Sequence, residues 1–377
     1  MDPDDWEQAG LFDADGVGAD ERRALLEYLT VRGATLDQMV EAHRLGRLPA
    51  VAGDLVMGNE PATLSVQEVA DHCGVPVERV QRVLLALGLS VMTDDKLRQD
   101  WVALIAAFEQ GAELIGDDAL VAFTRVLGAA ATSIAEAAVA LFYAELGPGT
   151  EREGSDELER AQMSEAATLA FSTVPDVLSG VLVVQFERAN RRAALARGWT
   201  PAGNHAADTV GEVVALGFVD LVDSTSWAEG LSLRDHSLAL SRFESAAWSS
   251  AVLAGGRVIK MIGDEVFFAA PTVDAACRIG IDVCAAAAAD PLLPPARGAL
   301  GYGRATPREG DYFGPLVNLV SRLTKTARPG TLVATQHAAE ALPAKNWNVR
   351  ELDPQPVKGL EAPVRVFVVT CAGQQVS

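Results

Sequence analysis

Residues 257–270, Arg-Val-Ile-Lys-Met-Ile-Gly-Asp-Glu-Val-Phe-Phe-Ala-Ala, decide the fold of the C-terminal half of the chain. Two apolar runs, Arg257–Ile262 and Glu265–Ala270, predict β-strands. The Gly263-Asp264 pair between them is typical of the tight turn in a β-hairpin. The stretch therefore predicts an antiparallel pair of strands with a carboxylate at its turn.

Strands and helices alternate on both sides of this hairpin. Before it, residues 210–219 predict a strand and 235–254 a helix. After it we expect helices at 274–289, 315–327 and 336–342, and strands at 296–305, 330–335 and 364–370. This order predicts an α+β fold over residues 210–373, with a sheet of ferredoxin-like plan and helices on one face.

The first half of the chain has a different character. Residues 1–20 contain seven acidic residues and no Lys or Arg, which predicts a flexible acidic tail. Residues 21–197 show helical periodicity and predict an all-α domain, with longer helices at 97–114, 118–145 and 155–197. The Gly/Pro-containing stretch that follows predicts a linker at 198–209.

Residues 64–88 have the layout of a helix-turn-helix, with Gly74 at the turn. Binding to DNA requires a basic face on the second helix. Arg79 and Arg82 stand there, but Glu78 lies beside them and the whole chain is acidic. We therefore interpret the segment as a packing unit that does not bind nucleic acid.

The composition bounds the partners and the compartment. Lys and Arg number 31 against 51 Asp and Glu, a formal net charge of −20, which disfavours nucleic acid and anionic membranes as partners. The four cysteines form no C-x-x-C pair, which indicates reduced thiols. With no signal peptide and no strongly apolar, uncharged stretch of 18 residues, we expect a cytoplasmic protein that does not span a membrane.

Two aspartates occupy positions suited to chemistry. Asp220 follows the apolar strand of Leu216-Gly-Phe-Val-Asp-Leu, and Asp264 stands at the hairpin turn. A buried carboxylate without a partner is costly, and two carboxylates with main-chain oxygens suit hard cations such as Mg²⁺. From spacing alone, a metal pair and two unrelated aspartates explain the pattern equally well.

A third motif lies in residues 308–322, a loop that runs into a helix. Asn318 and Arg322 are four residues apart, so they project from one face of that helix. The rest of the helix is apolar. The polar pair is explained either by contact with solvent or by an amide and a guanidinium directed at a substrate.

Together these motifs resemble the catalytic domain of class III adenylyl cyclases. The motifs are Phe218-x-Asp220-Leu-x-x-Ser/Thr, Lys260-x-x-Gly-Asp264, and Asp311-x-x-Gly-x-x-Val-Asn318-x-x-x-Arg322, in the family's order and spacing. The helical half resembles, more loosely, the regulatory domain of the mycobacterial pH-sensing soluble adenylyl cyclases. The resemblance implies an enzyme that converts ATP to cyclic AMP with two Mg²⁺ or Mn²⁺ per active site, as a homodimer with sites at the subunit interface.

The resemblance also implies residue roles. Asp220 and Asp264 would bind both metals, with the carbonyl of Leu221 as a further ligand. Lys260 and Asp311 would read adenine, Asn318 would orient the ribose, and Arg322 would stabilise the transition state. Lys358, in Pro356-Val-Lys-Gly-Leu360, matches a basic position that contacts the triphosphate. Asp223 departs from the pattern, since the family usually has glycine there.

The chemistry of the bases agrees with an ATP site. Adenine presents an amino donor and a ring acceptor, and the carboxylate of Asp311 and the ammonium of Lys260 complement them. Guanine presents the reverse order, which leaves mismatched polar groups. The alternatives are a guanylyl cyclase, a diguanylate cyclase suggested by residues 263–267, and a DNA-binding regulator with a cyclase-like sensor domain.

The N-terminal half has no catalytic constellation, and we expect it to regulate the C-terminal half, by pH or by a lipid. The linker contains His205, which titrates near neutral pH, although a silent exposed histidine is the simpler interpretation. The resemblance also suggests that the Ala-rich helices enclose a fatty acid or another lipid.

Overall fold

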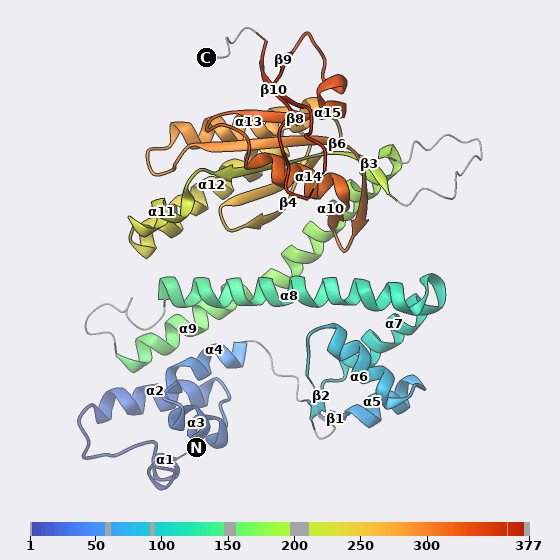
Figure 1. The fold of residues 1–377 in the computed structure, drawn as a ribbon. Helices are drawn as coiled ribbons and strands as arrows, with labels where there is room; N and C mark the ends of the chain where they lie inside the picture. Colours follow the sequence, from blue (N-terminus) through green and yellow to red (C-terminus); the bar gives the residue numbers. More distant parts are fainter. Residues whose placement is uncertain are drawn as a thin grey trace. The chain divides into compact units, whose positions relative to one another are not determined.

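The structure, a computed structural model, describes residues 2–56, 62–90, 95–146, 156–196, 211–359 and 361–372, without the side chains of 142–146 and 195–196. The chain forms two compact units, Met1–Gln185 and Phe186–Ser377, which are described separately (Figure 1). The linker expected at 198–209, and His205 within it, lie outside the described residues.

The first unit begins with a packed segment instead of the expected acidic tail. Helix α1 (Pro3–Gln8) opens with an Asp2 capping box, and Trp6, Leu11 and Phe12 are buried. They join the core formed by α2 (Ala19–Val31), α3 (Leu36–Arg44), η1 (Leu48–Ala50), α4 (Val51–Val56) and α9 (Glu157–Phe171). The prediction of a flexible tail at 1–20 is wrong because three large apolar side chains outweigh the charge of their neighbours.

The helix-turn-helix forms as expected, within a second core of this unit. Helices α5 (Val66–Cys73) and α6 (Val77–Ala86) join at Gly74, which adopts a left-handed conformation. The short strands β1 (Leu64–Ser65) and β2 (Lys96–Leu97) pair beside them, so the unit is not purely helical. Arg79 pairs with Glu109 at 2.7 Å, and Arg82 pairs with Asp117 at 2.5 Å. These ion pairs within the unit support the interpretation of this segment as a packing unit.

Three longer helices complete the pattern predicted for this half. Helix α7 spans Asp100–Ile115 and α8 spans Asp117–Leu146, close to the expected ranges. The single helix expected at 155–197 is divided into α9 (Glu157–Phe171) and α10 (Val174–Ala196). Pro175 lies in the first turn of α10, where its missing N–H costs no hydrogen bond, whereas it would break the interior of a continuous helix.

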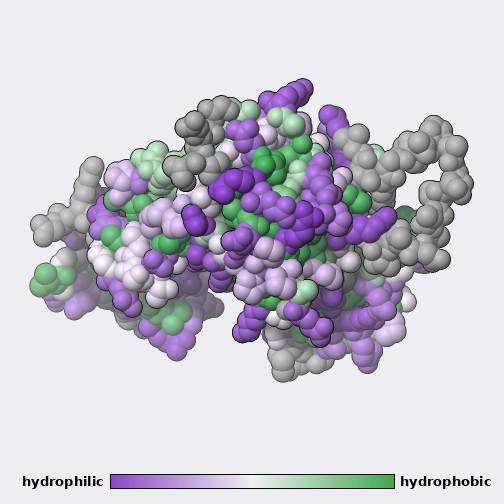
Figure 2. All heavy atoms as spheres, turned by 45° about the horizontal axis from the view of Figure 1, so that its top comes forward, coloured by the Kyte–Doolittle hydropathy of each residue, from purple (hydrophilic) through white to green (hydrophobic). Residues whose placement is uncertain are grey.

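Parts of these long helices expose apolar side chains. Val181, Leu182, Val183 and Phe186 of α10 are between 51% and 71% exposed. By length and composition alone, the stretches Asp117–Leu141 and Glu157–Ala194 are sufficient to cross a membrane, in contrast to the sequence-based expectation. Core helices of soluble proteins meet the same criterion, so this finding does not establish a membrane span. Figure 2 shows hydrophilic side chains over much of the face in view, with separate apolar areas between them.

The second unit is built on one mixed sheet in the order β4-β5-β3-β6-β8-β10-β9, with β7 paired to β6. The strands are β3 (Glu212–Leu221), β4 (Arg257–Ile262), β5 (Glu265–Ala270), β6 (Ala296–Arg308), β7 (Asp311–Phe313), β8 (Leu332–Thr335), β9 (Trp347–Glu351) and β10 (Val366–Cys371). The hairpin strands β4 and β5, together with β3 and β6, lie in the order β4-β5-β3-β6, which is the ferredoxin-like plan. The predicted fold class is therefore confirmed.

Helices cover both faces of this sheet, which corrects the expectation of helices on one face. Alternate residues of β3 enter different cores: Ala215 and Val219 contribute to one, Leu216 and Phe218 to the other. The first core also contains α12 (Leu233–Leu253), α13 (Val273–Ala289) and α15 (Gln336–Ala341), and the second contains α14 (Pro315–Thr324) (Figure 1). A strand that is apolar at successive positions requires cover on both sides, and α14 provides the second layer.

The division between the units falls within α10, after Gln185. The sequence predicts the end of the helical domain at residue 197, at the Gly/Pro stretch. The last turns of α10 instead belong to the second unit, where Arg192 lies near Arg257 and burial lowers the pKa of its guanidinium. One continuous helix therefore takes part in both units.

Candidate active site

The buried strand β3 delivers Asp220 to its C-terminal end. Residues from Val214 to Leu221 are all buried, and Asp220 is 7% exposed among them. Pairing on both sides fixes its neighbours: Asp220 lies opposite Glu265 of β5 and opposite Arg297 of β6. An aspartate in this position needs compensation for its lost hydration, so its partners decide what it can do.

The hairpin turn brings Asp264 to the same end of the sheet. Because Glu265 pairs with Asp220, the preceding residue, Asp264, lies at the end of β3. The N–H of Leu221 donates a hydrogen bond of 3.2 Å to the main-chain oxygen of Asp264. Gly263 takes the left-handed conformation (φ 64°) that the turn requires. The structure thus brings together the three residues predicted to bind metal.

Basic side chains compensate this acidic end of the sheet. The guanidinium of Arg297 pairs with Asp220 at 3.1 Å, and Lys325 contributes a further favourable charge. Burial nevertheless raises the pKa of Asp220 above its ordinary value, since desolvation outweighs these contacts. Burial, reinforced by the charge of Asp220, also raises the pKa of Glu265 to about 7.

Arg297 and Glu265 were absent from the sequence-based site. Both stand in strands and face Asp220 only through the pairing of β3 with β6 and β5. The one local signal was the charge itself, a Glu at the start of the otherwise apolar strand β5 and an Arg near the start of β6. Residues 77 positions apart, as Arg297 and Asp220 are, meet only when the sheet order is known.

The donor set at this end of the sheet fits a hard divalent cation. It offers the carboxylates of Asp220 and Asp264 and the main-chain oxygen of Leu221, and Mg²⁺ and Mn²⁺ favour such oxygen ligands. Within the described ranges, no group of three or more His, Cys, Asp or Glu side chains is arranged to hold a metal ion. The set therefore suits a cation that completes its shell with water and substrate oxygens, as Mg²⁺ commonly does.

A second group joins β4 to β7. The Nζ atom of Lys260 lies 2.5 Å from Oδ2 of Asp311, whose Oδ1 accepts a bond of 2.7 Å from the N–H of Tyr312. The side chain of Lys260 is 46% exposed and that of Asp311 is 19% exposed. One donor and one acceptor thus stand side by side and remain reachable from solvent, as recognition of a base edge requires.

Helix α14 carries the third group. It buries Val320 and Leu323 against the sheet, whereas Asn318 and Arg322 are exposed. Nη1 of Arg322 donates a hydrogen bond to the main-chain oxygen of Lys358. The predicted positions of Arg322 and Lys358 are therefore adjacent, although the contact uses the backbone of Lys358 and not its ammonium.

Asp223 lies in the turn after β3 with φ 53°, in the left-handed region. This conformation favours glycine, which gives a physical reason for the glycine of the family motif. Aspartate tolerates the region better than most residues do. The Asp223 side chain is exposed and makes no capping bond to the following helix α11 (Ser224–Glu229).

The predicted residues thus form groups that no direct polar contact links in the described part of the chain. Asp220, Leu221 and Asp264 meet at the end of β3. No hydrogen bond or ion pair within the described part of the chain joins their side chains to Asn318 or Arg322. The same holds between the two aspartates and the Lys260–Asp311 pair.

Comparison with known proteins covers both units. The adenylate cyclase regulatory domain family matches residues 4–189. The uncharacterized protein Rv2212 of Mycobacterium tuberculosis is 31% identical over 370 residues, which covers 97% of this chain and 94% of that protein. The pH-sensitive adenylate cyclase MT1302 of the same species is 29% identical over 374 residues, 95% of this chain and 90% of that protein. The chain belongs to the class III adenylyl cyclases.

A further relative resembles only part of this adenylyl cyclase. The adenylate cyclase of Glutamicibacter nicotianae is 39% identical over 128 residues, 34% of this chain and 32% of that protein. The two mycobacterial proteins, in contrast, resemble the cyclase over both halves. The family membership predicted from the three motifs is therefore confirmed, together with the regulatory domain predicted for the helical half.

Proposed function

We propose that this protein converts ATP to 3′,5′-cyclic AMP and pyrophosphate, with two divalent cations in each active site. The observation that carries the proposal is the meeting of Asp220 and Asp264 at the end of β3. The pairing of β3 with β5 brings these two carboxylates to the same end of the sheet. Together with the main-chain oxygen of Leu221, they supply ligands for such cations. When bound, the cations lower the pKa of the attacking hydroxyl and neutralise the triphosphate.

The remaining residues orient the reacting groups. The ribose 3′-oxygen attacks the α-phosphorus, the bond from that phosphorus to the bridging oxygen breaks, and pyrophosphate leaves. Asn318 holds the ribose so that attack and departure are in line. The guanidinium of Arg322 meets negative charge that grows on the α-phosphate oxygens, so it binds the transition state more strongly than the substrate.

Recognition of adenine is assigned to the pair formed by Lys260 and Asp311. The carboxylate accepts a hydrogen bond from the amino group of the base, and the ammonium donates to its ring nitrogen. The ammonium of Lys260 and the carboxylate of Asp311 pair with each other at 2.5 Å. Adenine must therefore enter between groups that are already oriented. Guanine would place donor against donor and acceptor against acceptor.

We further propose a symmetric homodimer with two active sites. Each site would take Asp220 and Asp264 from one subunit and Asn318 and Arg322 from the other, since no hydrogen bond or ion pair between described side chains joins the two groups. Lys358 would contact the triphosphate beside Arg322. We also propose that the protein is cytoplasmic.

Identification of the product tests the reaction. The purified protein is incubated with Mn²⁺ and either ATP or GTP, and the products are separated and identified. Cyclic AMP from ATP is expected. Cyclic GMP as the main product would establish the guanylyl cyclase alternative, and a cyclic dinucleotide from GTP would establish the diguanylate cyclase.

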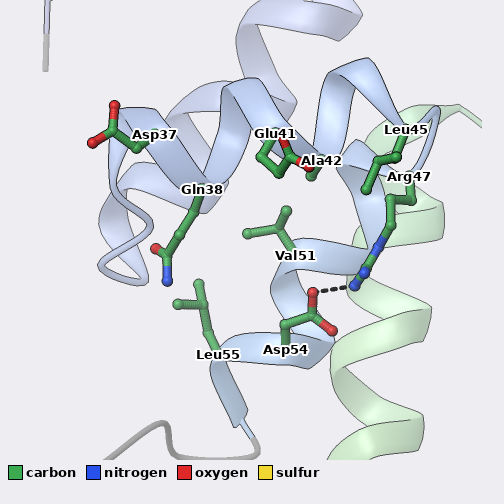
Figure 3. Close-up of a pocket in the computed structure, with 9 residues that line it drawn as sticks. All are labelled: Asp37, Gln38, Glu41, Ala42, Leu45, Arg47, Val51, Asp54 and Leu55. Carbon is green, nitrogen blue, oxygen red and sulfur yellow. Dashed lines mark hydrogen bonds and ion pairs between the residues drawn. The ribbon is translucent and has the colours of Figure 1, made fainter. Parts of the chain in front are cut away.

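We propose that the helical unit regulates the catalytic unit through α10, since that helix takes part in both. The regulatory signal is proposed to be pH or a lipid. The depression of 520 Å³ lined by α3, by Leu45 and Arg47 after it, and by α4 contains the carboxylates of Asp37, Glu41 and Asp54, and Asp54 pairs with Arg47 (Figure 3). Three carboxylates outnumber the one lining arginine, so this depression offers a fatty acid head group no net positive charge.

The regulatory role is tested by comparing the full chain with residues 204–377 from about pH 5.5 to 8, a range that brackets histidine titration. We expect different rates and a different pH profile for the shorter chain. Identical rates and profiles would remove the case for regulation by the helical unit.

A further inference from the structure

The two carboxylate oxygens of Asp220 have unequal surroundings. Nη2 and Nε of Arg297 both donate to Oδ2, at 3.1 and 3.4 Å. Within the described residues, no other side chain forms a hydrogen bond or ion pair with this carboxylate. One oxygen is therefore occupied by a cationic partner, and Oδ1 is left available to a cation.

Arg297 is anchored in this position from two directions. Its backbone lies directly opposite Asp220 in the pairing of β3 with β6. Its Nη1 atom donates a hydrogen bond of 3.3 Å to the main-chain oxygen of Lys325. The side chains of Arg297 and Asp220 are 22% and 10% exposed. A guanidinium held by its fork to a carboxylate and a carbonyl is a defined partner and not a mobile counter-ion.

This arrangement competes with the binding of divalent cations. A cation that approaches Asp220 meets the charge of the guanidinium close by, and a carboxylate that serves two cations needs the oxygen that Arg297 occupies. We propose that Arg297 restrains the binding of divalent cations at this site by holding Oδ2 of Asp220. The inference rests on the proposed metal role of Asp220 and Asp264. It makes Arg297 a positioning residue that sets the affinity of the metal site through one oxygen of Asp220.

The test measures the binding of Mn²⁺ to the full chain without nucleotide. Binding is measured by calorimetry and, independently, by the electron paramagnetic resonance signal of free Mn²⁺. Arg297→Gln removes the competing charge, and we expect it to bind Mn²⁺ about tenfold more tightly than the natural protein. Arg242→Gln is the matched control, because it removes an arginine that pairs with Asp290 at 3.2 Å elsewhere in the same unit. We expect no change in Mn²⁺ affinity for this control.

Thermal unfolding followed by circular dichroism checks that each variant is folded. Should Arg297→Gln not fold, Arg297→Lys replaces it. Lysine keeps a charge but lacks the fork that reaches both Asp220 and the Lys325 carbonyl, so a gain of several-fold is expected.

Two results would overturn the proposal in distinguishable ways. If Asp264→Asn abolishes Mn²⁺ binding while the folded Arg297 variant binds no more tightly than the natural protein, Arg297 does not restrain the metal, although the metal site stands. If neither Asp220→Asn nor Asp264→Asn weakens Mn²⁺ binding, the metal assignment itself is wrong, and the role of Arg297 falls with it.

Discussion

Mixing two inactive variants tests whether each active site is shared between subunits. Asp264→Ala removes a metal ligand at the turn between β4 and β5, and Arg322→Ala removes the guanidinium on α14. Both side chains lie near the surface of the unit, so neither change leaves a large cavity. Each variant alone should be nearly inactive, because every site of its homodimer lacks one essential group.

The expected recovery follows from the proposed division of each active site between two subunits. In a mixed dimer, one site carries both defects and the other carries neither. Random exchange between equal amounts makes about half of the dimers mixed, and each has one intact site out of two. The mixture should therefore reach about a quarter of the natural activity per subunit.

The assay measures cyclic AMP formation after the two proteins have exchanged subunits. Exchange is verified by carrying different affinity tags on the two variants and recovering both through either tag. The recovered rate should fall on dilution as dimers dissociate. A mixture of Asp264→Ala with Asp220→Ala is the matched control and should stay inactive, since both changes damage the same half of the site. If fully exchanged Asp264→Ala and Arg322→Ala also stay inactive, the site lies within one chain and the dimer proposal is wrong.

Three further predictions concern single features. Asp220→Ala should abolish activity and lower the free energy of unfolding by about 1 kcal/mol, because it strands a partly buried guanidinium, whereas Asp264→Ala should abolish activity with little change in thermal stability. Lys260→Glu combined with Asp311→Cys should weaken ATP turnover and admit some GTP, measured as kcat/KM for both nucleotides; unchanged ATP turnover would show that this pair does not read the base. Contacts with Tyr28 and Arg32 lower the pKa of Glu165, so this carboxylate stabilises the helical unit above its unfolded pKa of 4.5, and the stabilisation is lost as pH falls below that value. Denaturant unfolding should show Glu165→Gln less stable by about 1 kcal/mol at pH 7, with a deficit that shrinks as pH falls below the unfolded pKa of 4.5, and a deficit that does not change with pH would contradict the ionic origin.

The helical half shows where local patterns stop being sufficient. Periodicity predicts α7 and α8 closely, because the spacing of apolar residues is a property of each segment. The same approach assigned residues 1–20 to a tail, since charge dominates that composition. Trp6 and Phe12 instead order this segment, because they are buried in one core with residues of α2 and α9. The composition of the segment does not reveal these partners.

In the catalytic unit, the sequence alone determined the hairpin of β4 and β5, the position of Asp264 at its turn and the spacing of Asn318 and Arg322 on one helix face. These features depend on neighbours a few residues apart, where turn chemistry and helical periodicity act directly. Only the tertiary structure decided that α14 covers the second face of the sheet and that Arg297 meets Asp220. Those outcomes depend on strand order and register, which are set by the packing of many weakly interacting side chains over the whole unit, and no single stretch of sequence contains them.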